Sequence, residues 1–215
     1  MLASNQSLRP ARIAISSFFF MAGICFATWA SRIPDIQHHL KLSDAGLGTV
    51  LFAMPGGSML CLPFSGILVT RLGSRLVMLL STIIYAVLLC TIGTAETVWQ
   101  LALILFLFGV TGNLMNISMN TQAVGVEALY KRSVMASFHG LWSLAGFTGA
   151  AIGTLVIAKN ISPLIHFFFI ALLIGLLILI FFRYSLRSDA KQEIPDSLFA
   201  WPDKPLMKLG IISFC

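Results

Sequence analysis

Charged residues are scarce in this chain: Asp, Glu, Lys and Arg make up only 10% of its 215 residues. A soluble domain carries about 25% charged residues, so this composition excludes an ordinary water-soluble fold. Hydrophobic residues make up 58%, and the mean hydropathy is +0.92. The chain is therefore expected to be an all-α polytopic protein whose surroundings are a lipid bilayer.

Signals for metals, cofactors, disulfides and nucleic acid are also lacking. The four cysteines behave as small apolar residues, because three lie inside apolar spans and Cys215 is the last residue. The net charge is +6, but the basic residues are scattered and form no face for nucleic acid. We therefore expect no cofactor, no metal and no nucleic-acid partner.

Six apolar spans follow one another, each long enough to cross a bilayer, which needs about 20 residues. Their predicted limits are 13–31, 45–70, 76–94, 98–126, 133–158 and 163–182. The last begins at Ser162-Pro163, a capping serine followed by a first-turn proline. Residues 1–183 are thus predicted to form a six-helix bundle. Residues 184–205 are predicted to be a cytoplasmic linker and 206–215 the start of a seventh helix, so the chain looks truncated.

The basic residues predict the orientation of the bundle. With the N-terminus in the cytoplasm, eleven Lys and Arg residues lie inside, and only Arg32, Lys41 and Lys159 lie outside. Such a bias toward the cytoplasmic side is typical of multi-pass membrane proteins.

Three asparagines in the fourth span, Asn113, Asn116 and Asn120, are spaced three and four apart, which places them on one helical face. A polar stripe of this kind is expected to face protein or a water-filled cavity, because facing lipid is costly. Interhelical hydrogen bonds, worth about 0.6 kcal/mol each, are the plain alternative. Three amides exceed what packing usually needs, so a substrate cavity is favoured, with Asn116 at its centre.

The spans repeat their character in the order polar, glycine-rich, apolar. This pattern predicts three-plus-three inverted repeats in which spans one and four line a cavity, while spans three and six face outward. In span five, Ala145, Gly149 and Gly153 form a small-residue seam suited to close helix packing. In span two, the Pro-Gly-Gly segment 55–57 predicts a kink.

Four further side chains are candidates for the cavity or its entrance. His139 is expected either to contact substrate or carry a proton, or to form a hydrogen bond at a helix end. Trp29 and Trp142 are candidates for stacking on the solute. Arg32, at the outer end of span one, is either a gate or, the favoured interpretation, a snorkelling interface anchor. His166, in the first turn of span six, is expected at the membrane interface.

The segment 66–75, Gly-Ile-Leu-Val-Thr-Arg-Leu-Gly-Ser-Arg, resembles the loop between helices two and three of the major facilitator superfamily. The residues that match the family motif are Gly66, Leu68, Arg71, Gly73 and Arg75. The resemblance implies that Gly66, Arg71, Gly73 and Arg75 belong to a gating loop that moves during conformational change. Thr70 stands where the family has an aspartate that helps latch the outward-facing state.

Segments 27–34, 116–120 and 137–146 resemble the fucose-permease-like branch of that family. The resemblance implies the N-terminal half of a twelve-helix permease in the bacterial inner membrane, partnered by a C-terminal six-helix half. It also implies secondary active or facilitative transport of a small polar, sugar-like solute by alternating access. Ala30 and Asn116 stand where proton-coupled relatives hold carboxylates, so any coupled proton is expected on His139, on Glu127 or in the other half.

Alternatives from other classes remain open. An efflux antiporter for drugs or metabolites is less favoured, because Gly146 is followed by Phe147 and not by the proline of such antiporters. An intramembrane enzyme needs a base beside its nucleophile, and the only candidate pairing is Ser118 or Ser143 with His139 or His166. A non-transporting fragment is the third alternative.

Overall fold

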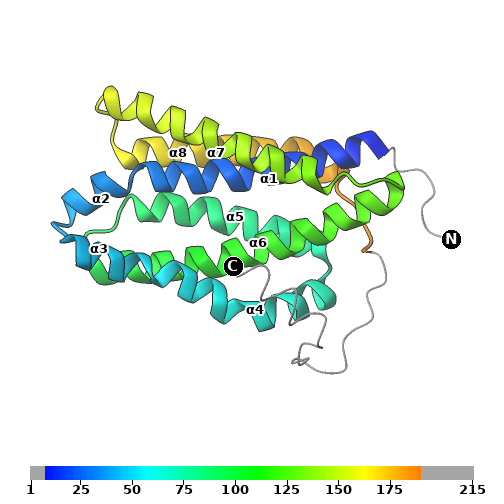
Figure 1. Cartoon of the computed structure of the whole chain (residues 1–215), viewed down its shortest axis with the longest axis horizontal. Coiled ribbons are helices and arrows are strands. Elements are labelled where there is room, and N and C mark those ends of the chain that lie inside the picture. The colour runs from blue at the N-terminus through cyan, green and yellow to red at the C-terminus, as the bar shows by residue number, and fades with distance from the viewer. Residues whose placement is uncertain (1–7, 190–215) are drawn as a thin grey trace, which may run out of the picture.

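The structure is a computed structural model that describes residues 8–189, and within that range it contains helices and turns but no strand (Figure 1). Its elements are α1 (Leu8–Ser31), α2 (Ile33–His39), α3 (Asp44–Leu51), α4 (Ala53–Leu72), α5 (Ser74–Ile92), α6 (Val98–Tyr130), α7 (Met135–Ala158), α8 (Pro163–Phe181) and the 3-10 turn η1 (Phe182–Tyr184). Among the described residues, six helical segments are long and apolar enough to cross a membrane, with α3 and α4 forming one of them. The predicted all-α, six-span architecture is confirmed. Most of the predicted linker 184–205, and all of the predicted seventh helix 206–215, lie outside the described residues.

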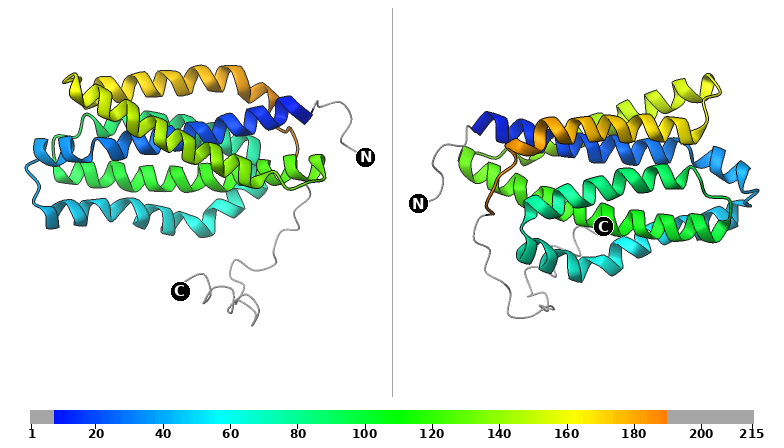
Figure 2. Two further views of the ribbon diagram at one scale, coloured as in Figure 1. Left: turned by 45° about the horizontal axis from the view of Figure 1, so that its top comes forward. Right: turned by 180° about the vertical axis from the view of Figure 1, so that it is seen from behind.

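Helix α1 is the central helix of the bundle. It packs against α5, α6, α7 and α8, and 61% of its most apolar stretch is buried. Phe18 and Phe19 of α1 are fully enclosed, as are Phe138 of α7 and Phe167 of α8. Figure 2 shows the long helices running side by side along one axis. Because lipid is as apolar as these side chains, the helices are held together by close packing and interhelical hydrogen bonds.

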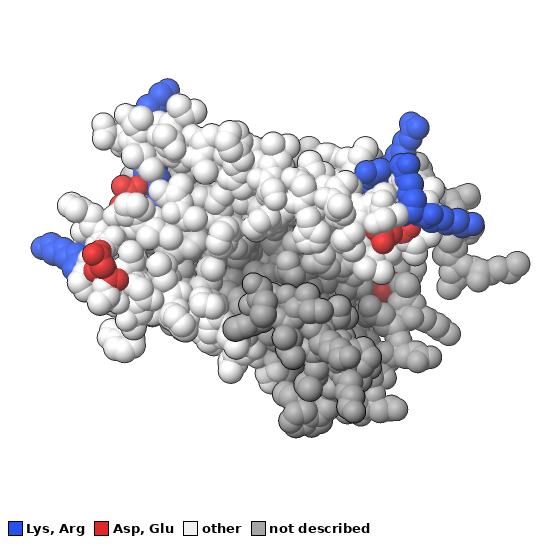
Figure 3. Space-filling model, in the orientation of Figure 1, with Lys and Arg blue, Asp and Glu red and all other residues white. Residues whose placement is uncertain are grey.

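Basic side chains gather at one end of the bundle, named here the N-terminal end. That end holds the start of α1, the α4–α5 and α6–α7 turns and the end of α8 (Figure 1). On the face drawn in Figure 3, more Lys and Arg side chains lie at this end than at the other. The opposite end holds α2 and the α7–α8 turn, and among the described residues its basic side chains are Arg32, Lys41 and Lys159.

The second span is broken at Phe52 and not at the Pro-Gly-Gly segment 55–57. Phe52 caps both the end of α3 and the start of α4. Pro55 therefore lies in the first turn of α4, where its missing N–H leaves no hydrogen bond unmade. The connection between the first two predicted spans contains α2, which has Pro34 in its first turn.

Gly57 and Gly109 allow α4 and α6 to cross in direct contact. A Cβ atom on Gly57 would lie 2.9 Å from the carbonyl carbon of Phe106, and one on Gly109 would lie 2.8 Å from that of Met54. Both distances are below van der Waals contact with backbone, so only glycine fits. Ser58 adds a hydrogen bond from its Oγ to the Gly109 carbonyl oxygen at 3.0 Å. These two glycines thus set the spacing of α4 and α6.

The predicted small-residue seam of α7 is confirmed, and it packs against α1. Ala145, Gly149 and Gly153 are buried. A Cβ atom on Gly149 would lie 2.9 Å from the Cβ of Ala27, and Gly153 faces Ser31. Small side chains at four-residue intervals therefore bring the two backbones together, as in other membrane helix pairs.

The prediction that span three faces outward holds for only one face of α5, where Leu80, Ile84 and Val87 are exposed, because the opposite face is buried. Ser81, Thr82 and Tyr85 are buried, and α5 is more enclosed than α3–α4 or α7. The hydroxyl groups of Ser81 and Thr82 donate to carbonyl oxygens one turn earlier in the same helix, at 2.7 and 2.6 Å. A nearly apolar helix can therefore hide a packed face, because hydropathy does not separate contact with lipid from contact with protein.

Candidate substrate cavity

A cavity of about 170 Å³ lies between α1, α4, α5, α6 and α7. Its lining residues are Ala22, Phe26, Met54, Ser58, Tyr85, Phe108, Gly109, Gly112, Met115, Asn116, Met119 and Trp142. None of these lining residues is charged. Aromatic rings and thioethers make the walls apolar, while a few amide and hydroxyl groups offer directed hydrogen bonds. This combination is typical of sites for small organic molecules.

Of the three predicted asparagines, only Asn116 lines the cavity. Asn120 donates from its Nδ2 to the Asn116 carbonyl oxygen at 2.8 Å and to the Asn116 Oδ1 at 3.3 Å. The Nδ2 of Asn116 has no hydrogen-bond partner within residues 8–189, and its side chain is exposed. The hydrogen bond from Asn120 therefore occupies the Oδ1 of Asn116, while the Asn116 Nδ2 stays free to donate to a molecule in the cavity.

Asn113 serves helix packing instead. Its Oδ1 accepts a hydrogen bond from the Ser65 Oγ at 2.6 Å. Because Ser65 belongs to α4, this bond joins α4 to α6, the two helices that also cross at Gly57 and Gly109. Interhelical hydrogen bonding, the alternative that the sequence left open for all three asparagines, is therefore the role of Asn113.

Aromatic residues build one side of the cavity. Tyr85 stacks on Phe108 with ring centroids 3.8 Å apart, and Trp142 lies tilted against Phe26 at 6.4 Å. The Tyr85 hydroxyl lies beside Gly112, and it has no hydrogen-bond partner among the described residues. It is thus a second free donor at the cavity. Sequence reasoning missed Tyr85 because span three was expected to face outward, although a tyrosine in such an apolar span was a usable signal.

His139 and Trp29 lie outside this cavity. His139 is exposed on α7, and its ring meets Phe19 edge-on with centroids 5.3 Å apart. Trp29 is only 2% exposed and packs in the core of the bundle. Neither residue is among the lining of the cavity that holds Asn116 and Trp142.

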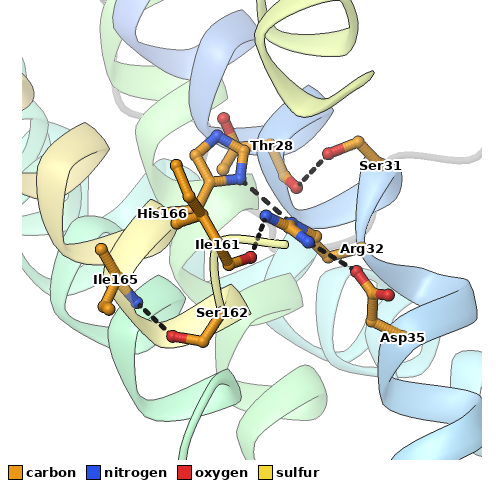
Figure 4. Close-up of polar contacts among 8 residues, drawn as sticks. All are labelled: Thr28, Ser31, Arg32, Asp35, Ile161, Ser162, Ile165 and His166. Atoms are coloured by element: carbon orange, nitrogen blue, oxygen red, sulfur yellow. Dashed lines mark hydrogen bonds and ion pairs between the residues drawn. The ribbon is translucent and has the colours of Figure 1, made fainter. Parts of the chain in front are cut away.

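Arg32 is buried at the opposite end of the bundle, with 2% exposure, so it does not snorkel. Its guanidinium donates from Nε to the His166 Nδ1 at 3.3 Å and from Nη2 to the Ile161 carbonyl oxygen at 2.9 Å, and it pairs with Asp35 at 2.7 Å. Figure 4 shows these partners reaching it from α2, the α7–α8 turn and α8. The snorkelling predicted for Arg32 is therefore wrong, because protein encloses its side chain as well as that of His166. The interface position of His166 stays a prediction. A gating movement of Arg32 would have to break all three contacts.

The predicted gating loop divides into two pairs of residues. Gly73 joins α4 to α5 with φ +83° and ψ 140°, a conformation open to glycine alone. Arg75 donates to the Phe182 carbonyl oxygen at 3.3 Å, and its guanidinium carbon lies 4.6 Å from the centre of the Phe182 ring. Gly66 and Arg71 are exposed. Thus Gly73 shapes the turn between α4 and α5 and Arg75 contacts η1 after α8, while Gly66 and Arg71 remain at the surface.

A buried polar cluster beside this loop was missed from the sequence. Gln122 of α6 donates to the Ser74 Oγ at 2.7 Å and accepts from the Leu186 N–H at 2.9 Å. Asp189 accepts a hydrogen bond from the Ser74 N–H at 2.6 Å and another from the Ser74 hydroxyl. Its carboxylate thereby caps the start of α5, where the helix dipole favours negative charge. The partners are far apart in sequence, so no local pattern indicates them.

Comparisons with known proteins agree with this architecture. Residues 13–213 match the family model of the Major Facilitator Superfamily. The chain is 32% identical over 213 residues to an uncharacterized MFS-type transporter of Yersinia pestis and 30% identical over 210 residues to an uncharacterized transporter, y4wD, of Sinorhizobium fredii. These alignments cover 98% and 97% of this chain but 55% of each relative, so the chain spans about half the length of these curated relatives.

A third relative, Membrane protein MosC of Rhizobium meliloti, is 28% identical over 146 residues, which is 68% of this chain and 36% of that protein. The family match extends over nearly the whole chain, and the described residues provide six helices able to cross a membrane. The chain belongs to the major facilitator superfamily.

Proposed function

We propose that this chain is the N-terminal half of a membrane transporter that moves a small, uncharged, sugar-like polar solute by alternating access. The observation that carries the proposal is the cavity itself, where Asn116 and Tyr85 present free donors beside the ring of Trp142. Its lining holds no charged side chain. An ionic solute in such surroundings would lose its hydration without gaining a countercharge, so a neutral solute is favoured.

The residues take different roles in this proposal. Asn116 donates a hydrogen bond to a solute hydroxyl or carbonyl oxygen, and Asn120 keeps its amide in that orientation. Trp142 offers an apolar ring face on which the C–H face of a sugar-like solute stacks. His139 lies on α7 one turn before Trp142 and is a candidate contact during opening or closing.

The bundle is proposed to sit in the bacterial inner membrane with its N-terminal end in the cytoplasm. Eight of the described Lys and Arg residues lie at that end and three at the other, which supports this orientation. A C-terminal six-helix half is the proposed partner, which would close the cavity from the other side. Membership of the fucose-permease-like branch belongs to the same proposal and rests on segments 27–34, 116–120 and 137–146.

Coupling to protons finds little support in this half. No carboxylate lines the cavity among the described residues. Glu127 accepts the N–H groups of Val134 and Met135 at 2.8 and 2.9 Å, so its carboxylate caps the start of α7. Transport is therefore proposed to be facilitative, or coupled through His139 or through the C-terminal half.

A transport assay tests the proposal. The chain, together with its C-terminal half, is reconstituted in proteoliposomes, and uptake of neutral sugars and polyols is compared with uptake of their phosphorylated derivatives. Neutral solutes are expected to enter, and Tyr85→Phe, which removes only the hydroxyl, is expected to raise KM about fivefold. Uptake restricted to charged solutes, or no uptake of any solute in the panel, would contradict the proposal.

A further inference from the structure

A second and larger pocket, of about 590 Å³, lies at the N-terminal end of the bundle. It is named here the arginine pocket, after Arg9, Arg12 and Arg132, which line it together with Tyr130. Arg9 and Arg12 are three residues apart in the first turns of α1, so they share one face of that helix. Arg132 follows the end of α6. Three positive charges thus come to one pocket from two parts of the chain.

The charge of the arginine pocket is not neutralised by the described residues. The guanidinium carbons of Arg12 and Arg132 lie 5.4 and 5.7 Å from the centre of the same ring, that of Tyr130. Arg12 also donates to the Ser137 Oγ at 3.2 Å, which holds it in place. Within residues 8–189 none of the three arginines forms an ion pair. The lining of the pocket contains no acidic side chain, and Glu127 accepts hydrogen bonds at the start of α7.

The rest of the lining of the arginine pocket is mixed. Ile13, Phe20 and Leu141 are apolar, and Ser16 and Ser17 add two hydroxyl groups. In α7, Ala145 faces α1, and the helical repeat places Leu141 and Trp142 on opposite flanks of Ala145. Because Trp142 lines the substrate cavity, the arginine pocket lies on the other flank of α7 and is a separate site.

We propose that the arginine pocket binds the phosphate group of an anionic phospholipid, whose acyl chains lie along Ile13 and Phe20. Guanidinium groups match phosphate oxygens in charge and in paired hydrogen-bond geometry. Basic pockets between membrane helices near the cytoplasmic surface suit anionic headgroups. The apolar part of the lining favours a lipid over free phosphate, because it extends from the charged end toward the middle of the span.

Native mass spectrometry of the purified chain tests this proposal. The chain in detergent is titrated with dioleoylphosphatidylglycerol and, separately, with the zwitterionic dioleoylphosphatidylcholine, which has the same acyl chains. The variant Arg9→Gln/Arg132→Gln removes two charges from the pocket. The control Arg71→Gln/Lys131→Gln removes two exposed charges from the same end that do not line it. Elution volume and unfolding temperature check that each variant is folded.

The wild-type chain and the control are expected to retain phosphatidylglycerol in preference to phosphatidylcholine. Each arginine contributes about fivefold, so the double variant should lose about 25-fold in affinity for phosphatidylglycerol, and Arg132→Gln alone about fivefold. An equal loss in the control, or no preference in the wild type, would overturn the proposal. Millimolar inorganic phosphate should leave bound phosphatidylglycerol in place; its displacement would assign the pocket to free phosphate and overturn the lipid assignment.

Discussion

Gly56 and Gly57 are neighbours in α4, yet alanine at these two positions should have opposite effects. At Gly57 the new Cβ would lie 2.9 Å from the Phe106 carbonyl carbon, and closer to its oxygen. Because the obstacle is backbone, α4 and α6 would have to separate by about 1 Å, and such overpacking costs about 3 kcal/mol. The separation would also stretch the bond from Ser58 to the Gly109 carbonyl oxygen.

Gly56→Ala is the matched control. A Cβ at Gly56 meets no atom within 4 Å, so the change should only raise helix propensity, by up to about 1 kcal/mol. The free energies of unfolding of the two variants should thus differ by about 3–4 kcal/mol. The measurement is unfolding in detergent, followed by circular dichroism. Gly109→Ala should resemble Gly57→Ala, because it meets Met54 from the other helix. Equal stability of Gly56→Ala and Gly57→Ala would refute the crossing as described.

Two further predictions concern single residues at the two ends of the bundle. Gly73→Ala should lower the free energy of unfolding by about 1–3 kcal/mol, because alanine is strained at φ +83°. Gly66→Ala, its control at a helical position, should not lower the free energy of unfolding. Equal loss in both variants would contradict this reasoning. Arg32→Ala should cost about 3 kcal/mol, because it leaves the buried His166 Nδ1 without its donor. The exposed Lys41→Ala is its control, and thermal unfolding in detergent measures both; a harmless Arg32→Ala would show that the buried contacts contribute nothing.

Local signals in the sequence were sufficient for much of the fold. The seam of Ala145, Gly149 and Gly153 was predicted from spacing alone, because small residues at four-residue intervals have one common use in membranes. The helix start at Ser162-Pro163 is present, with the Ser162 Oγ accepting the Ile165 N–H at 3.4 Å. Each signal is local to one helix, the seam to α7 and the cap to α8, so periodicity and capping rules can detect it.

Contacts between distant segments were beyond such reasoning. Arg32 and His166 form a buried pair across 134 positions, and Asp189 caps Ser74 across 115. Taken singly, each of these polar residues looks like a solvated or interfacial side chain. In the asparagine stripe, the spacing placed the three residues on one helical face, but it could not tell which of them line the cavity and which join helices. Asn113 meets Ser65 on α4, whereas Asn116 lines the cavity, because the two helices cross near one end of the stripe.

The different roles of Asn113 and Asn116 also provide the most direct test of the substrate cavity. Asn116→Ala and Asn113→Ala remove the same group from one helix face, one turn apart. The measurement is the KM for the best solute of the uptake panel, together with the unfolding temperature of each variant. The account predicts that Asn116→Ala raises KM about fivefold and leaves the unfolding temperature unchanged, while Asn113→Ala lowers the unfolding temperature. An Asn116→Ala chain that fails to fold, or that transports with an unchanged KM, would contradict the account.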